Sequence, residues 1–358
     1  MLNFTVGPVM SDDDILSIGS EQVPYFRTPE FSNLMFENER LIKKFSKASE
    51  DSRAVFITGS GTASMEAVIM NCFNENDKVL IVNGGSFGHR FVELCQIHHI
   101  PYDEILCTTG KTLRKEQLES YDGKKYTGFL VNVHETSTGV HYDMNMISEF
   151  CKKNKLFLVV DAISSFLADD FDMENLGVDV MITGSQKALA CPPGIAIITL
   201  SGRAVDRVNN NSCKSMYFDL KDMLLNAKRG QTPYTPAITI LLQINARLNQ
   251  IKNDGGVKVE IERTTNLAND FRNKIKEFPF EVRCKCLSNA VTTVHSKEIL
   301  DVNLVEILKN EYDIWVSTAR DDLSKDMIFR VGHMGDLSTE DNDTLIDALR
   351  DIQKRGLF

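Results

Sequence analysis

The chain has 358 residues, which is enough for two domains of ordinary size. Apolar residues make up 42% of it and charged residues 25%, a balance typical of globular proteins that excludes disorder as the main state. The formal net charge is -10, from 50 acidic and 40 basic residues without a basic block, so we expect no nucleic acid partner.

Membrane, export and metal functions are not expected either. The best apolar run, residues 156–168, contains Asp161 and is shorter than the roughly 18–20 apolar residues that span a bilayer. The first residues, MLNFTVGPVMSDDD, have no basic start and no long apolar stretch, unlike a signal peptide. The cysteines are scattered, and the pair Cys284 and Cys286 has no second pair at metal-ligand spacing. We therefore expect a cytoplasmic protein with reduced thiols and no metal site.

Between about residues 54 and 200, short apolar runs alternate with amphipathic stretches of helix length. The apolar runs predict strands at 54–57, 78–82, 126–133, 156–160, 178–182 and 195–200. The amphipathic stretches between them predict helices at 63–72, 88–98 and 144–153. Strands of this kind, separated by helices, are typical of a mainly parallel sheet covered on both faces. The fold class expected is α/β.

After about residue 236 the pattern becomes mixed. Helices are expected at 236–252, 257–276, 302–310 and 341–354, and strands at 280–284, 290–295, 314–316 and 327–331. This pattern suits a smaller α+β domain. We predict an N-terminal segment at 1–20, a large ligand-binding domain at 21–245 and a small C-terminal domain at 246–358.

Asp161 and Lys187 follow two of the predicted strands. Asp161 ends a run that should be buried, where a carboxylate is costly unless it meets a cation or a strong donor. Lys187 follows the strand at 178–182 by a few residues, and ligands bind at this end of parallel strands. Together they suggest a pyridoxal phosphate site, in which the lysine forms a Schiff base and the acid holds the pyridine nitrogen protonated.

A phosphate cradle is predicted at Ser60, Gly61 and Thr62. These residues lie between a strand and a helix, where free amides and hydroxyls bind phosphate well. The segment is not GxGxxG, and no GK[ST] follows, so dinucleotide and P-loop interpretations are weak. A zinc HExxH at His134 is excluded because Thr138 stands where the second histidine would be.

In this order and spacing, the motifs resemble the class V aminotransferases, which are pyridoxal phosphate enzymes of fold type I. The resemblance runs from VGP at 6–8 to FRVG at 329–332 and is nearest to the alanine–glyoxylate, serine–pyruvate and 2-aminoethylphosphonate–pyruvate group. It implies an enzyme that moves an amino group from alanine, serine or 2-aminoethylphosphonate to pyruvate or glyoxylate. It also implies a homodimer whose active sites are shared between the subunits.

The resemblance assigns site residues in the first half of the chain. Ser60, Gly61 and Thr62 match the phosphate-binding loop, and Phe87 matches the aromatic residue that stacks on the cofactor ring. Ser137, in ETSTG, matches a hydroxyl near the phenolic oxygen of that ring.

The resemblance assigns the remaining site residues as well. Asp161, in DAISSF, matches the partner of the pyridine nitrogen, and Lys187, in SQK, matches the lysine that bonds to the cofactor. Gln186 precedes that lysine and is expected beside the cofactor. Thr235 matches a residue that reaches the phosphate of the other subunit, and Arg330 matches the arginine that binds the substrate carboxylate.

The motifs do not select one substrate. DAISSF is similar to the phosphonate branch, but that branch typically has asparagine where Gln186 stands and often histidine where Val133 stands. A cysteine desulfurase or another class V enzyme is an alternative, with Cys284 or Cys286 as the candidate sulfur carrier. A non-catalytic ligand-binding protein on the same fold is a further alternative, which the presence of Lys187 disfavours.

Overall fold

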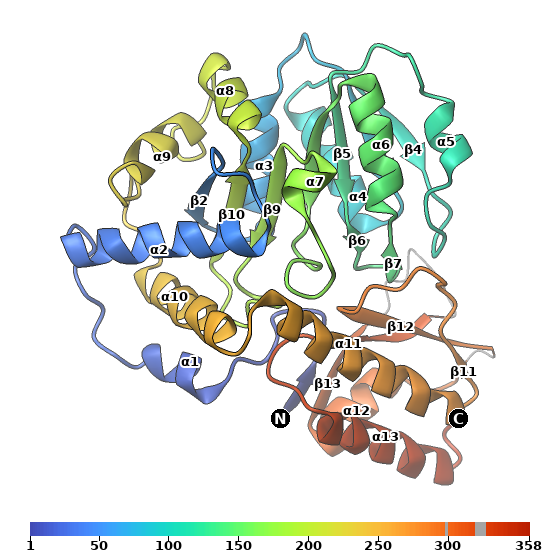
Figure 1. Ribbon diagram of the computed structural model, residues 1–358. Coiled ribbons are helices and arrows are strands. Elements are labelled where there is room, and N and C mark those ends of the chain that lie inside the picture. The colour runs from blue at the N-terminus through green and yellow to red at the C-terminus, as the bar shows by residue number, and fades with distance from the viewer. Residues whose placement is uncertain (298–299, 319–326) are drawn as a thin grey trace.

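The computed structural model describes residues 1–297, 300–318 and 327–358. Its largest element is a seven-stranded sheet in the order β2-β10-β9-β8-β5-β3-β4 (Figure 1). The strands are β2 (Arg53–Thr58), β3 (Val79–Asn83), β4 (Tyr102–Leu106), β5 (Gly128–Asn132), β8 (Phe157–Asp161), β9 (Val180–Gly184) and β10 (Ile195–Leu200). All neighbouring pairs are parallel except the two made by β10, which is antiparallel to both β2 and β9. The α/β fold with a mainly parallel sheet is confirmed.

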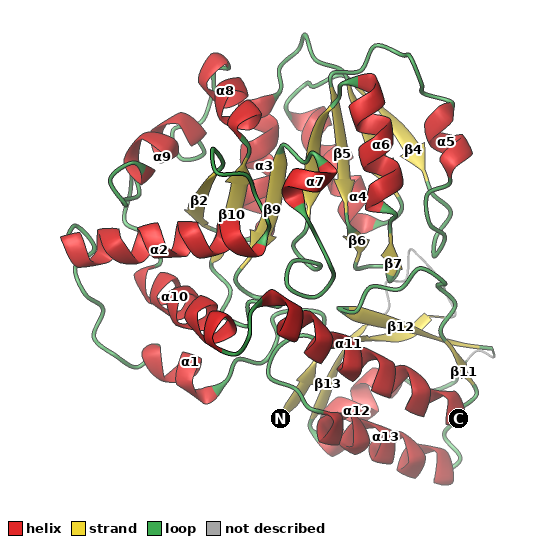
Figure 2. Ribbon diagram, in the orientation of Figure 1, coloured by secondary structure: helices red, strands yellow, loops and turns green. Residues whose placement is uncertain are grey.

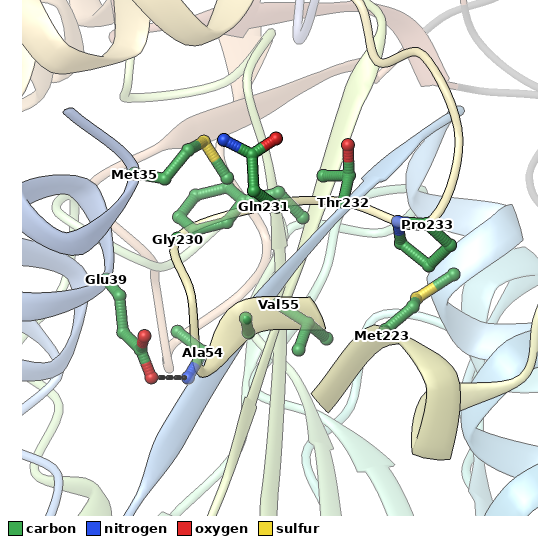
Figure 3. Close-up of a pocket in the computed structure, with 11 residues that line it drawn as sticks. Met35, Glu39, Ala54, Val55, Met223, Gly230, Gln231, Thr232 and Pro233 are labelled. Atoms are coloured by element: carbon green, nitrogen blue, oxygen red, sulfur yellow. Dashed lines mark hydrogen bonds between the residues drawn. The ribbon is translucent and has the colours of Figure 1, made fainter. Parts of the chain in front are cut away.

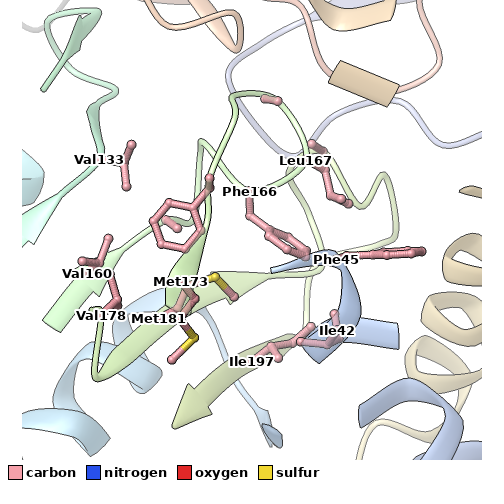
Figure 4. Close-up of a cluster of buried hydrophobic side chains, with 14 of the residues drawn as sticks. Ile42, Phe45, Val133, Val160, Phe166, Leu167, Met173, Val178, Met181 and Ile197 are labelled. Carbon is pink, nitrogen blue, oxygen red and sulfur yellow. The ribbon is translucent and has the colours of Figure 1, made fainter. Parts of the chain in front are cut away.

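Helices cover both faces of this sheet, as Figure 2 shows. Alternate residues of a strand point to opposite faces, so Leu80 and Val82 join one buried cluster while Val79 and Ile81 join the other. The first cluster includes Ile42 of α2, which lies near Ile197 in Figure 4. The helices that contribute to the first cluster are α1 (Asp13–Ile18), α2 (Pro29–Phe45), α5 (Lys115–Glu119), α6 (Met144–Asn154), α7 (Met173–Leu176) and α10 (Ile238–Asn253). Those of the second are α3 (Gly61–Cys72), α4 (Ser86–Ile97), α8 (Gly202–Asn210) and α9 (Leu220–Ala227).

A second sheet, with its own buried cluster, lies at the lower right of Figure 1. It has five strands in the order β1-β13-β14-β12-β11. The strands are β1 (Leu2–Phe4), β11 (Phe280–Glu281), β12 (Val291–Ser296), β13 (Ile314–Thr318) and β14 (Met327–Gly332). The helices packed with it are α11 (Val257–Lys274), which continues as a 3-10 turn (Ile275–Glu277), α12 (Leu304–Tyr312) and α13 (Thr339–Lys354).

The N-terminal segment belongs to both parts of the molecule. β1 pairs in parallel with β13, placing Leu2 opposite Ile314. The short helix α1 (Asp13–Ile18) packs against α10 instead. The proposed boundaries at residues 20 and 245 stay a prediction.

A two-stranded hairpin completes the fold. It consists of β6 (His134–Glu135) and β7 (Val140–His141) and directly follows β5. Across the residues that the structure describes, no helix is both long and apolar enough to pass through a bilayer.

Candidate active site

The predicted site residues gather where the parallel strands end. β2, β3, β5, β8 and β9 all run in the same direction, so their carboxyl ends lie at one edge of the sheet. Asp161 is the last residue of β8, and the other predicted residues of this part follow the neighbouring strands: Ser60, Gly61 and Thr62 after β2, Phe87 after β3, Ser137 after β5, and Gln186 and Lys187 after β9. This is the edge at which open α/β sheets bind ligands.

Lys187 is enclosed by the N-terminal segment. Its side chain is 8% exposed, and its Nζ donates a hydrogen bond to the carbonyl of Val6. Gly7 lies against the same amine, because a Cβ added at Gly7 would be 2.8 Å from Nζ, and its φ of +128° also favours glycine. Burial lowers the pKa of Lys187 to about 8; the positive charge of Arg330 acts in the same direction, and Asp161 opposes it.

Asp161 is a buried carboxyl beside this amine. It is 5% exposed, and its Oδ1 accepts a hydrogen bond of 2.8 Å from the amide of Ile163. Burial raises the pKa of Asp161 to about 6. The amide of Ile163 and the charges of Arg90 and Lys187 act against that rise, whereas Glu135 adds to it. In these surroundings the charged form of the carboxyl is stabilised by a partner that carries a proton or a positive charge.

The predicted phosphate loop begins α3. Ser60 is the N-cap residue of this 12-residue helix, and its side chain makes no capping hydrogen bond to any residue that the structure describes. The backbone amides of the first turn and the Ser60 hydroxyl are therefore suited to an anionic ligand. Thr62 accepts a hydrogen bond of 3.0 Å from Arg90, whose guanidinium also lies 5.0 Å from the centre of the Phe87 ring. Arg90 thus links the loop to the predicted stacking residue.

Glu135 is a buried site residue that the sequence analysis did not identify. Its Oε2 accepts from the amide of Gly88 at 2.9 Å and its Oε1 from the amide of Phe87 at 3.4 Å, so the carboxylate caps α4. Ser137 donates its hydroxyl to the same carboxylate and accepts from the amide of Ser86 at 3.2 Å. Glu135 therefore fixes both Phe87 and Ser137. The signal was an acid two residues before the predicted hydroxyl, at the end of a short buried strand.

Arg330 connects the second sheet to the site. It lies on β14, is largely buried, and its Nη1 donates to the carbonyl of Thr136 at 3.0 Å. Its Nη2 and Nε donate to the carbonyl of Thr318 at 3.0 and 3.2 Å. The guanidinium is near enough to Lys187 to lower the pKa of that amine. The structure therefore brings Arg330 to the same place as Lys187 and Asp161.

Gln186 and Thr235 are less buried than Lys187 and Asp161. Gln186 is half-buried, and its carbonyl accepts from the amide of Val9 at 3.2 Å, which holds the N-terminal segment over the site. Thr235 is exposed and lines a surface hollow together with Tyr217. Tyr217 stacks on Tyr234 with ring centres 5.6 Å apart. Within this chain, Thr235 is on the outer surface rather than beside Lys187.

Figure 3 shows a separate cavity beside β2. It is lined by Met35 and Glu39 of α2, by the start of β2, by Met223 of α9 and by residues 230–233. Glu39 accepts a hydrogen bond of 3.1 Å from the amide of Ala54, one of the lining residues. None of the predicted site residues lines this cavity, so it is a different feature from the site around Lys187.

Of the two cysteines that a cysteine desulfurase could use, Cys284 is poorly suited to carry sulfur, whereas Cys286 is exposed. Cys284 is buried outside β11, where no strand continues as predicted, and its Sγ donates to the carbonyl of Cys286 at 3.1 Å. Burial raises the pKa of Cys284, which keeps it a thiol rather than the reactive thiolate. In the described part of the chain, no cluster of three or more His, Cys, Asp or Glu side chains could hold a metal ion.

Comparison with known proteins agrees with this geometry. The family model for class-V aminotransferases matches residues 25–320. An uncharacterized aminotransferase of Methanocaldococcus jannaschii is 32% identical, covering 92% of this chain and 86% of the relative. The soluble hydrogenase 42 kDa subunit of Anabaena cylindrica is 29% identical over 88% of this chain and 83% of its own length. The L-aspartate–glyoxylate aminotransferase of Paracoccus denitrificans is 29% identical over 87% of this chain and 81% of its own.

The solved structures show the same fold. Aspartate aminotransferase of subgroup IV from Thermus thermophilus superposes with a TM-score of 0.91 at 24% identity, and the match covers 100% of both chains. The fold is therefore type I of the pyridoxal phosphate enzymes. With a family match over most of its length and the lysine and aspartate together at the edge of the sheet, the chain belongs to the class-V aminotransferases and is a transaminase.

Proposed function

We propose that this transaminase uses pyridoxal phosphate to move an amino group from a small donor to a small 2-oxo acid. The donors proposed are alanine, serine or 2-aminoethylphosphonate, and the acceptors are pyruvate or glyoxylate. The observation that carries the proposal is the buried pair of Lys187 and Asp161, at the carboxyl ends of two adjacent parallel strands. The glyoxylate-linked name of the Paracoccus denitrificans relative supports the choice of acceptor.

The residues at the site fit pyridoxal phosphate. The start of α3, with the hydroxyls of Ser60 and Thr62, offers donors to a phosphate, and Gly61 leaves no room for a side chain against Ile163. Phe87 is half-buried and held at the start of α4, where it can lie against an aromatic ring. Asp161 is a buried acceptor that would gain from a protonated ring nitrogen.

When bound, pyridoxal phosphate supplies an aldehyde that bonds to amines and a ring that withdraws electrons from the substrate. Lys187 supplies the amine, and its lowered pKa keeps part of it neutral and nucleophilic near pH 8. When it is free, the same amine would accept a proton from the substrate Cα and hold it for return to the substrate. Asp161, as a carboxylate, would hold a proton on the ring nitrogen of the cofactor.

Three further residues orient the reaction partners. Arg330 is suited to bind the substrate carboxylate, because a guanidinium offers two parallel N–H groups to a carboxylate. Ser137, already fixed by Glu135, is proposed to contact the phenolic oxygen of the cofactor, and Gln186 to lie beside the cofactor. These roles are taken from the resemblance and agree with the positions of the side chains.

A homodimer is part of the proposal. Thr235 is exposed, next to an aromatic pair on the outer surface, which suits a residue that reaches the phosphate of a partner subunit. We also propose a cytoplasmic location, because all eight cysteines are free thiols, as a reducing compartment keeps them.

Reconstitution with the cofactor tests the proposal. Pyridoxal phosphate added to the purified protein should give a new absorbance band, and borohydride should fix the cofactor to a peptide containing Lys187. The Lys187→Ala variant should fold, lose the fixed adduct and lose turnover. An adduct on another lysine, or no spectral change with any donor or acceptor, would refute the assignment.

A further inference from the structure

His134 is a second buried polar side chain at this site, and no role has been given to it so far. It is 3% exposed, and neither ring nitrogen makes a hydrogen bond with any residue that the structure describes. Its carbonyl is bonded, accepting from the Asn132 side chain at 3.2 Å, so only the imidazole lacks partners. A buried polar atom without a partner is destabilising, which makes two such atoms on one ring unusual.

The imidazole of His134 lies within range of the charges at the site. Neighbouring residues of a strand point to opposite faces, and Glu135 points to the start of α4. His134 therefore points the other way. Two residues later, the carbonyl of Thr136 accepts the hydrogen bond from Arg330. The positive charges that act on His134 are those of Lys187, Arg272 and Arg330, so the imidazole and the proposed carboxylate anchor share one region.

The imidazole is neutral in these surroundings. Burial is the main cause that holds the pKa of His134 well below its ordinary value, and the nearby His141 and the three cations add to it. A neutral imidazole has one N–H donor and one nitrogen acceptor. It is therefore matched to a group that can also donate and accept, and a hydroxyl is the smallest such group.

His333 is a buried histidine with one ring nitrogen held by the fold. It is fully buried, and its Nε2 is 2.8 Å from the hydroxyl of Thr292, whereas its Nδ1 has no partner among the described residues. Thr292 is in turn bonded to Arg272 at 2.8 Å, so this histidine is part of a fixed network in the second sheet. The contrast makes the missing partners of His134 a local feature of the site.

We propose that His134 determines donor specificity by hydrogen-bonding a hydroxyl group on the side chain of the amino donor, while Arg330 holds the carboxylate. The inference rests on the proposed function and narrows its substrate class to small hydroxy amino acids, with serine as the simplest. Serine and alanine differ by a single hydroxyl, so the pair isolates this contact. A site that hydrogen-bonds a substrate hydroxyl discriminates against the analogue that lacks it.

The test compares kcat/KM for serine and for alanine within each protein, with glyoxylate as the acceptor. Both values are measured on the same preparation, so the serine-to-alanine ratio of kcat/KM does not depend on the fraction of active enzyme. The wild type should favour serine. His134→Leu removes both nitrogens at similar size and should lower the serine-to-alanine ratio about tenfold. His134→Gln keeps a neutral donor and acceptor and should restore part of the ratio.

His333→Leu is the matched control, because it removes a buried imidazole outside the site. It should lower the thermal stability and leave the serine-to-alanine ratio unchanged. The inference is overturned if the wild type favours alanine, or if His134→Leu loses both donors equally. Should His134→Leu not fold, a His134→Gln serine-to-alanine ratio below that of the wild type supports the contact, and a ratio no lower than that of the wild type overturns it. If the wild type transfers amino groups from neither donor nor any other, the proposed function itself has failed.

Discussion

Replacing Lys187 by methionine should stabilise the protein in the absence of cofactor. The pKa of Lys187 falls from its ordinary 10.5 to about 8, mainly because the amine is buried. Each tenfold change in proton affinity is worth about 1.4 kcal/mol, so the charged amine costs the folded apoprotein about 3 kcal/mol at pH 7. Methionine keeps the length of the side chain but loses the hydrogen bond to Val6, worth about 1 kcal/mol. We expect a net gain of about 2 kcal/mol.

The stability difference between Lys187→Met and the wild type should depend on pH. The unfolded chain binds the Lys187 proton more tightly than the folded chain, so the stability of the wild type rises as the pH goes from 8 to 10.5. Above that range the amine is neutral in both states and the cost is gone. The advantage of Lys187→Met should therefore be full at pH 7 and nearly absent at pH 10.

Urea unfolding of both apoproteins at pH 7 and pH 10, under reducing conditions, measures the difference in the free energy of unfolding. Lys125→Met, at an exposed lysine, is the control and should change that free energy by less than about 0.5 kcal/mol at either pH. A Lys187→Met variant that is less stable than the wild type at pH 7, or equally favoured at both pH values, would refute the reasoning.

Three further variants test the other roles. Asp161→Asn should lower turnover by about 100-fold or more without lowering the urea stability, because a neutral amide fits the buried position but cannot keep the ring nitrogen protonated. Wild-type rates would contradict this role. Phe87→Leu should weaken the affinity for pyridoxal phosphate by roughly 1 kcal/mol in a cofactor titration, because the ring stacking is lost. An unchanged affinity would show that Phe87 only packs in the core. Arg330→Lys should raise the KM for the 2-oxo acid about tenfold, or about 1.4 kcal/mol, since lysine loses the two-point contact; an unchanged acceptor half-reaction would show that the carboxylate binds elsewhere.

The central strands could be predicted because parallel strands are buried on both faces. β8 and β10 are continuous apolar runs with no other plausible structure, and both formed within one or two residues of the prediction. β4 was missed because it lies at the edge of the sheet and carries acidic residues within YDEIL. The strand predicted at 280–284 was wrong beyond residue 281, because apolar residues there fill a loop rather than a ladder.

The site residues that follow the strands of the sheet could be predicted, and the contacts between distant segments could not. Asp161 and Lys187 follow recognisable strands, so the topology of parallel sheets is enough to bring them together. Nothing in the sequence shows that the backbone of Val6 returns to the Lys187 amine, 181 residues later. Glu135 was overlooked for a related reason. Its partners are backbone amides at the start of α4, and every residue type except proline has such an amide, so the sequence does not reveal them.

The pairing of β1 with β13 also fixes the order in which the site can be assembled during protein synthesis. Leu2 is among the first residues made, but its partner Ile314 is made only when most of the chain already exists. The large sheet can form earlier, since its last strand ends at Leu200 and domains fold as their residues emerge. Until β13 is complete, the segment around Val6 lacks the sheet that anchors it, and only contacts such as that of Val9 with Gln186 can hold it near Lys187. We therefore expect the full enclosure of the Lys187 amine to follow the synthesis of β13.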